Sequence, residues 1–156
     1  MPLLIDTNNQ FRCVRRAFKN ERARIDYQKL MEAVESEFGT QEHKVAYIAK
    51  YFKDSAIRFS DKMRSIGFKT KLKETREQVL GDRKIQVADC GIDLVVDCFR
   101  LHNANEPLVI GSSDYRLEPL LRHFKGEVLV WSCGVPSVFG KYAEVREMTE
   151  EFLQED

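Results

Sequence analysis

The sequence predicts a three-layer α/β/α sandwich in which a mostly parallel central sheet is covered by helices on both faces. Two observations predict this fold class. Short apolar runs typical of strands alternate along the chain with segments whose apolar residues recur at the helical period. Residues 2–6 form a short apolar run that ends in an acid and 107–111 a second apolar run, as in parallel strands that helices cover on both sides. The length of 156 residues and the hydrophobic content of 43% suit one domain over residues 1–156.

The first half of the chain supplies strands at residues 2–6 and 43–51. A third strand follows at 68–74, where apolar residues alternate with lysines that face water. Three helical stripes accompany these strands: Phe11, Val14 and Phe18; Tyr27, Leu30, Val34 and Phe38; Ala56, Phe59, Met63 and Ile66. Asp26 is a predicted N-cap and Gly67 a predicted helix end. The polar residues 74–89 are predicted to form a loop.

The second half begins with a predicted helix within residues 88–101. Its apolar stripe, which is expected to face the core, consists of Ile92, Val95, Val96 and Phe99. Strands are predicted at 107–111 and 127–133. Between them, a helix from about Asp114 carries Leu117, Leu120, Leu121 and Phe124. The acidic end of the chain is predicted to be a helix that packs through Val145, Met148 and Phe152.

Charge and cysteine content narrow the possible functions. The 25 basic and 25 acidic residues cancel, but residues 1–90 hold 19 basic and 13 acidic side chains. This asymmetry indicates either two halves that interleave in space or a basic groove suited to a polyanion. The four cysteines form no C-x-x-C pair, which favours reduced thiols in a cytoplasmic protein over a zinc site or disulfides. No membrane segment or secretory leader is expected. Self-association into a homodimer, for example through the acidic tail, stays open.

Four acidic side chains are predicted to meet where ligands gather in parallel sheets, outside the carboxyl ends of the strands. Asp6 ends the first strand, Asp114 follows a later one, and Asp93 and Asp97 lie on the intervening helix. Such crowding raises carboxylate pKa values unless a cation shares the space, and hard divalent ions take these oxygens. The alternatives are helix capping for Asp6 and Asp114, a helix-dipole role for Asp93, and an ion pair with Arg100 for Asp97.

Three short motifs occur in order: "IDTNN", "CGIDLVVDCFRL" and "LVIGSSDYRLEPLLRHFKGEVLVW". Together they resemble the NYN, or LabA-like, branch of the PIN-domain nuclease superfamily. The matching positions are Asp6 and Asn9 in the first motif, Gly91, Ile92, Asp93 and Asp97 in the second, and Gly111, Asp114, Tyr115, Pro119 and Leu120 in the third. Cys90 replaces a lysine of the family's pattern. Ser112 stands where the pattern has its first acid, unless a shifted alignment gives that place to Asp114.

The resemblance implies a PIN-like fold and a metal-dependent endoribonuclease that hydrolyses phosphodiester bonds of RNA, with single-stranded RNA as the expected substrate. It implies Mg²⁺ or Mn²⁺ as cofactor, with Asp6, Asp93 and Asp114 as ligands. Asp97 and Asn9 complete the predicted catalytic set. The acid missing at Ser112 leaves an alternative open, in which the protein binds RNA in a regulatory role and has lost cleavage.

Basic and hydroxyl side chains near these acids are expected to bind the substrate. The candidates are Arg12, Arg15, Arg16, Ser112, Ser113 and Arg116. A second basic row is predicted at Lys69, Lys71 and Lys73. Phosphate contacts of this kind give affinity without reading sequence. Phe11 and Tyr115 are expected to stack on unpaired bases.

Overall fold

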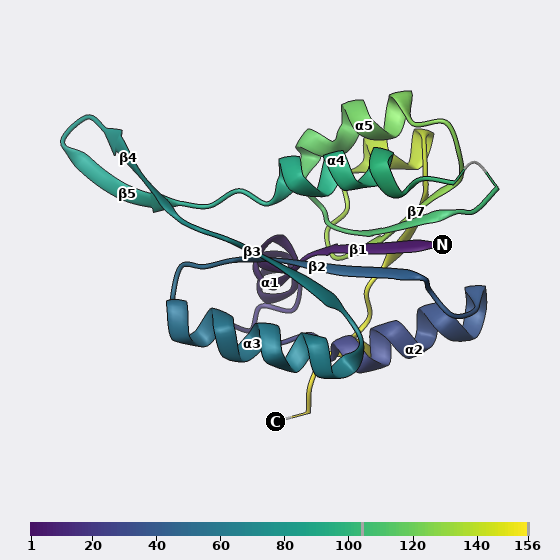
Figure 1. Ribbon diagram of the computed structural model, residues 1–156, viewed down its shortest axis with the longest axis horizontal. Helices are drawn as coiled ribbons and strands as arrows, with labels where there is room; N and C mark the ends of the chain where they lie inside the picture. The colour runs from purple at the N-terminus through teal and green to yellow at the C-terminus, as the bar shows by residue number, and fades with distance from the viewer. Residues whose placement is uncertain (104, 156) are drawn as a thin grey trace.

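The computed structural model describes residues 1–103 and 105–155, and its centre is a six-stranded sheet (Figure 1). The strand order is β3-β2-β1-β6-β7-β8, and all neighbouring strands are parallel. These strands are β1 (Pro2–Asp6), β2 (His43–Ala49), β3 (Lys69–Lys73), β6 (Leu108–Gly111), β7 (Val128–Ser132) and β8 (Glu144–Glu147). The predicted α/β class with a parallel central sheet is confirmed.

Helices cover both faces of this sheet (Figure 1). On one face lie α1 (Thr7–Ala17), α2 (Tyr27–Phe38) and α3 (Lys53–Ile66), and on the other α4 (Gly91–Leu101) and α5 (Glu118–His123). Each face has its own apolar cluster, one around Leu30 and Met63 and the other around Leu94 and Val130. Short 3-10 turns complete the chain: η1 (Tyr115–Leu117), η2 (Ser137–Lys141) and η3 (Glu150–Phe152). No helix in the described ranges is long and apolar enough to cross a membrane.

Several element boundaries follow from local chemistry that the sequence displays. Asp6 and Asp26 are the N-caps of α1 and α2, and each carboxylate accepts a backbone N–H three residues later at 3.1 Å. Helix α3 ends at Gly67, whose φ of 117° lies in the region that favours glycine. The predicted helix boundaries at Asp26 and Gly67 are confirmed.

The strand order reverses between β1 and β6. From this point β1, β2 and β3 succeed one another toward one edge, and β6, β7 and β8 toward the other. The crevice outside the carboxyl ends of the strands at such a reversal is the usual ligand site of open α/β sheets. Gly111 ends β6 there, and a Cβ on it would lie only 2.7 Å from Nε2 of the buried Gln10. Glycine therefore allows α1 to pack closely against the end of β6.

The prediction of a loop over residues 74–89 is wrong. The structure has an antiparallel hairpin, β4 (Arg76–Leu80) and β5 (Arg83–Val87), which projects from the body of the protein (Figure 1). Its strands are almost wholly exposed, so they lack the apolar pattern that marks a core strand. The two-residue turn Gly81-Asp82, with φ of 62° at Gly81, is the hairpin signal that the sequence did contain.

The predicted inner face of α4 is wrong except at Val95, which is partly buried against the core. Ile92, Val96 and Phe99 are 71%, 56% and 56% exposed. The buried side chains of this helix are Leu94, Asp97 and Cys98. The helix can turn Asp97 inward because hydrogen-bond donors from two strands and its own helix meet the carboxylate. Two of these donors are distant in the sequence, so a prediction from apolar periodicity alone assigns the exposed face of α4 to the core.

The acidic C-terminal segment is not the predicted helix. It forms β8, which pairs in parallel with β7, and then the short turn η3. Met148 and Phe152 are buried and Val145 is partly buried, so the predicted apolar contacts form on a different backbone. Pairing with β7 supplies hydrogen bonds that the apolar spacing does not reveal.

Candidate active site

Asp6 is the buried carboxylate of the candidate site, with 6% of the residue exposed. Burial raises the pKa of Asp6 above its usual value, while the Asn9 backbone N–H and the charge of Arg12 act in the opposite direction. The negative charges of Asp114 and Asp89 raise this pKa further. Three carboxylates therefore influence one another at the carboxyl ends of β1 and β6.

Asp114 lies in the turn after β6 and is bonded to Arg116. Its carboxylate caps η1 by accepting the Arg116 backbone N–H at 3.0 Å. The guanidinium of Arg116 donates to Asp114 at 2.6 and 3.0 Å and to Asp89 at 2.7 Å. These hydrogen bonds hold the pKa values of Asp114 and Asp89 below their usual range. Both capping roles considered from the sequence, for Asp6 and Asp114, are thus present.

Asp89 is the residue that the sequence interpretation missed. It precedes α4, and its carboxylate accepts the Gly91 backbone N–H at 2.8 Å. A Cβ on Gly91 would lie 3.0 Å from Oδ1 of Asp89 and 3.9 Å from Oδ2 of Asp114. Glycine thus lets α4 begin close to both acids. The available signal was an Asp-x-Gly sequence at the start of a predicted helix, where acceptor side chains gather.

Asn9 connects α1 to the turn that carries Asp114. Its side-chain oxygen accepts the Ser113 backbone N–H at 2.8 Å. The Ser113 hydroxyl donates to Ser132 at 2.8 Å, and the Ser112 hydroxyl accepts the Asp114 N–H at 3.2 Å. Ser112 and Ser113 are 1% and 9% exposed. The hydroxyls of both serines, expected to contact substrate, have partners inside the protein and shape this turn.

Asp93 and Asp97 of α4 each pair with a lysine of β3. Lys73 Nζ lies 2.9 Å from Asp93, and Lys71 Nζ lies 2.6 Å from Asp97. Two acids four residues apart on a helix are thus balanced by two cations two residues apart on a strand. This pairing engages two lysines of the row that was expected to face the substrate.

Asp97 is the more constrained of the two acids, with 2% of the residue exposed. Tyr47 donates to it at 2.6 Å, and Arg100 lies 3.0 Å away, so the ion pair considered as an alternative role for Asp97 is present. Burial alone would raise the pKa of Asp97, but the hydrogen bonds from Lys71, Tyr47 and Arg100 together hold it below its usual value. The carboxylate therefore anchors α4 to β2 and β3.

Comparison with known proteins identifies the family. The profile of the NYN domain matches residues 1–151. The chain belongs to the NYN domain family. NYN domains are part of the PIN-like nuclease superfamily, as the motifs in the sequence indicated.

The fold of this NYN domain also resembles a solved structure. A protein of unknown function from Vibrio parahaemolyticus is 18% identical and superposes with a TM-score of 0.79 over 98% of this chain and 94% of that chain. At this identity the likeness shows the fold alone. A search among curated proteins found no matching relative.

The predicted metal ligands Asp6, Asp93 and Asp114 do not converge. Within residues 1–103 and 105–155, no group of three or more His, Cys, Asp or Glu side chains lies close enough together to hold a metal ion. Asp93 bonds to Lys73 instead. The charges of Asp89 and Asp114 nevertheless act on Asp6, and carboxylate oxygen is the ligand type that suits the divalent metals typical of this superfamily. The Arg116 guanidinium supplies the positive charge between Asp89 and Asp114.

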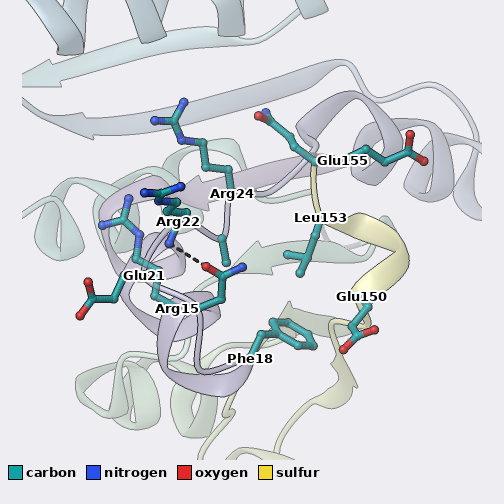
Figure 2. Close-up of a pocket in the computed structure, with 11 residues that line it drawn as sticks. Arg15, Phe18, Glu21, Arg22, Arg24, Glu150, Leu153 and Glu155 are labelled. Carbon is teal, nitrogen blue, oxygen red and sulfur yellow. Dashed lines mark hydrogen bonds between the residues drawn. The ribbon is translucent and has the colours of Figure 1, made fainter.

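Of the three arginines of α1 that were expected to bind substrate, only Arg12 is shown to act on Asp6. Arg12 is close enough to lower the pKa of Asp6, and Arg15 and Arg16 are exposed farther along the helix. Arg15 lines a cavity of about 780 Å³ together with Arg22 and Arg24 (Figure 2). Acidic side chains, Glu21, Glu150 and Glu155, line the same cavity, so its charge is mixed.

Proposed function

We propose that this NYN domain is a metal-dependent endoribonuclease that hydrolyses phosphodiester bonds of single-stranded RNA at the carboxyl ends of β1 and β6. The observation that carries the proposal is the buried Asp6 at the end of β1, where the strand order reverses beside β6 in a nuclease-type domain, with Asp89 and Asp114 near enough for their charges to raise its pKa. This is where open α/β sheets present a reacting group to a ligand.

Asp6 and Asp114 are the proposed ligands of Mg²⁺ or Mn²⁺. A bound divalent ion lowers the pKa of water and neutralises charge on the reacting phosphate. Of the two carboxylate oxygens of Asp6, only Oδ1 accepts a hydrogen bond from the described residues, so Oδ2 is free for a cation. Asn9 holds the turn that carries Asp114. Asp93 joins this set only after it leaves Lys73.

Arg116 connects substrate binding to this chemistry. A guanidinium bonds to phosphate in the same paired geometry as to carboxylate. An RNA phosphate therefore competes with Asp89 and Asp114 for Arg116. The two acids that Arg116 releases keep their negative charge but lose its neutralising partner, which increases their attraction for a cation. This assigns Arg116 to the substrate side of the site.

A second candidate function is RNA binding without cleavage. The ion pairs of Arg116 with both Asp89 and Asp114 favour it, because a guanidinium satisfies these acids without metal. The uncharged Ser112 at the position of a family acid favours it as well.

The experiment that tests the proposal follows an end-labelled single-stranded RNA incubated with purified protein and Mn²⁺, with EDTA as the metal-free arm. Asp6→Asn removes the negative charge of Asp6 and retains a side-chain oxygen that can cap α1. We expect it to lower the cleavage rate by about 100-fold. Asp26→Asn is the matched control, since Asp26 caps α2 through the same 3.1 Å hydrogen bond.

Cleavage by the Asp6→Asn protein at the wild-type rate, or cleavage that EDTA leaves unchanged, would sink the nuclease proposal. RNA binding without any cleavage by the wild-type protein supports the second candidate.

A further inference from the structure

A second cavity, of about 590 Å³, lies between α1 and α3. It begins at Thr7 and Asn8, directly after Asp6, and extends past the end of β2 to Phe59 and Lys62 of α3. Its volume falls within the roughly 300–1,000 Å³ of small-molecule sites. It shares Arg15, Arg24 and Gln154 with the cavity of Figure 2, so the two hollows adjoin.

The lining of this α1–α3 cavity combines aromatic rings with positive charge. Its aromatic side chains are Phe11, Tyr51, Phe52 and Phe59, and its cations are Arg15, Arg24, Arg58 and Lys62. No Asp or Glu of the described ranges lines it. Rings that can stack on bases, together with cations that can contact phosphates, are the combination that binds single-stranded nucleic acid.

Contacts with the protein hold most of these rings in place. The Phe11 ring packs at centroid distances of 5.3 Å from Phe59 and 6.5 Å from Tyr27. The Arg15 guanidinium lies 5.9 Å from the centre of the Phe11 ring. The Tyr51 hydroxyl is bonded to the backbone of Ala88 at 3.1 Å. Part of the wall is therefore pre-ordered, which lowers the entropy cost of binding.

Phe52 differs from the other rings because it is 79% exposed. It precedes the first residue of α3, where its side chain makes no capping hydrogen bond. An aromatic ring this exposed at the rim of a cationic cavity is available to stack on a base.

The first turn of α1 separates this cavity from the candidate active site. The Asn8 side chain accepts the Ala49 N–H at 2.7 Å on the cavity side, whereas Asn9 accepts the Ser113 N–H on the side of Asp114. A strand whose phosphate reaches Asp6 therefore lies within one helical turn of the cavity.

We infer that the α1–α3 cavity binds a nucleotide of single-stranded RNA, with the base stacked on Phe52 and the flanking phosphates near Arg15 and Arg58. The choice of RNA as the polyanion rests on the proposed function, whereas the binding chemistry rests on the cavity itself. Stacking and phosphate contacts accept any base, so the site adds affinity without sequence preference.

The test measures binding of a fluorescently labelled single-stranded RNA by anisotropy in EDTA, so that cleavage plays no part. Phe52→Ala is matched by Phe99→Ala, an exposed ring on α4. Arg58→Ala is matched by Arg64→Ala on the same helix, where Arg64 pairs with Asp61. We expect Phe52→Ala and Arg58→Ala each to raise Kd by at least about fivefold, and the controls by less than about twofold.

A second pair of variants separates stacking from apolar contact. Phe52→Trp keeps a stacking ring, so wild-type affinity is expected, together with quenching of the new indole fluorescence on RNA addition. Phe52→Leu keeps apolar surface without a ring and is expected to bind as weakly as Phe52→Ala. Adenosine monophosphate and duplex RNA serve as competitors, and weak competition by both identifies a single strand as the ligand.

Equal Kd values for Phe52→Ala and wild type would overturn the inference. So would equal losses in the cavity variants and their controls, competition by duplex as strong as by single strand, or a wild-type protein that binds no RNA. Binding that depends on Phe52 in a protein that never cleaves RNA would support the cavity and reject the nuclease proposal.

Discussion

On the α4 face of the sheet, the acids near the candidate site are bonded to cations, whereas the cations of the α1–α3 cavity line a space that no described acid enters. The first region contains the pairs Lys73–Asp93, Lys71–Asp97 and Arg116–Asp114. The second gathers Arg15, Arg24, Arg58 and Lys62 beside four aromatic rings. A formal net charge of zero thus combines a region of ion-paired charges with a region whose cations form no ion pair in the described ranges.

This difference indicates different uses. Paired charges on the α4 face satisfy buried groups and fix the helix against β2 and β3, which serves the fold. The cations of the α1–α3 cavity form no ion pair within the described ranges, although glutamates line the adjoining cavity that shares Arg15 and Arg24. Cations without ion-pair partners attract anions, which favours a binding role. Arg116 lies between the two uses, because it is half-exposed and yet holds two acids.

The largest effect on stability is expected from breaking the buried part of the paired region. Asp97→Asn removes the charge that faces Lys71, Tyr47 and Arg100. We expect a loss of about 2–3 kcal/mol in the free energy of unfolding, measured with urea at pH 7. Asp93→Asn is the control, since Asp93 is partly exposed, and should cost less than about 1 kcal/mol. Equal losses in the two variants would contradict the anchoring role of Asp97.

The stability that Asp97 contributes is expected to depend on pH. The pKa of Asp97 in the folded protein lies below its ordinary value of 3.8, so its stabilisation is present above pH 3.8 and is lost as the pH falls through the folded-state pKa. The stability difference between wild type and Asp97→Asn should therefore be constant near neutrality and shrink below pH 3.8. A difference that persists unchanged at lower pH would mean that packing, not charge, is lost.

Removing Arg116, which is bonded to Asp89 and Asp114, is expected to change metal binding at the candidate site. Arg116→Ala frees Asp89 and Asp114 and is expected to tighten Mn²⁺ binding about tenfold, or roughly 1.4 kcal/mol. Calorimetry and the rise in Tm with Mn²⁺ both report this gain. Arg122→Ala, which removes a weaker 3.8 Å pair with Glu118, should bind Mn²⁺ like the wild type. Unchanged Mn²⁺ binding in Arg116→Ala would remove Arg116 from the site.

The sequence predicts the architecture in the core strands, because burial there requires apolar side chains. β1, β6 and β7 are buried along their whole length, and Asp6 and Asp114 reach one edge of the sheet because they end or follow neighbouring parallel strands. The hairpin β4–β5 and the strand β8 were missed, because exposed pairing leaves no apolar period to detect.

The site was less predictable because its partners are distant in sequence. Lys71 and Lys73 meet Asp97 and Asp93 only because β3 lies at the sheet edge beside β2. Asp89 ends the polar segment 74–89, for which the sequence predicts a loop. No sequence spacing indicates that Arg116 reaches both Asp89 and Asp114, since that contact depends on where α4 begins.

The smallest expected effect concerns the salt dependence of RNA binding. The binding constant K falls as salt rises, so a plot of log K against log salt has a negative slope. Arg15→Ala should make this slope less steep by about 0.7, the value for one phosphate contact with a single strand. Lys69→Ala on β3 is a control outside the cavity and should leave the slope unchanged. Equal slopes for the wild type and Arg15→Ala would show that Arg15 contacts no phosphate.

The central claim is that the acids at the carboxyl ends of β1 and β6 act on the phosphate while the α1–α3 cavity holds the strand. The most direct test measures, on one RNA, the cleavage rate with Mn²⁺ at saturating protein and the Kd in EDTA, for Asp6→Asn and Phe52→Ala. We expect Asp6→Asn to lose about 100-fold in cleavage and keep its Kd, and Phe52→Ala to raise Kd at least about fivefold and keep its saturated cleavage rate. Loss of both properties together in each variant would contradict the account.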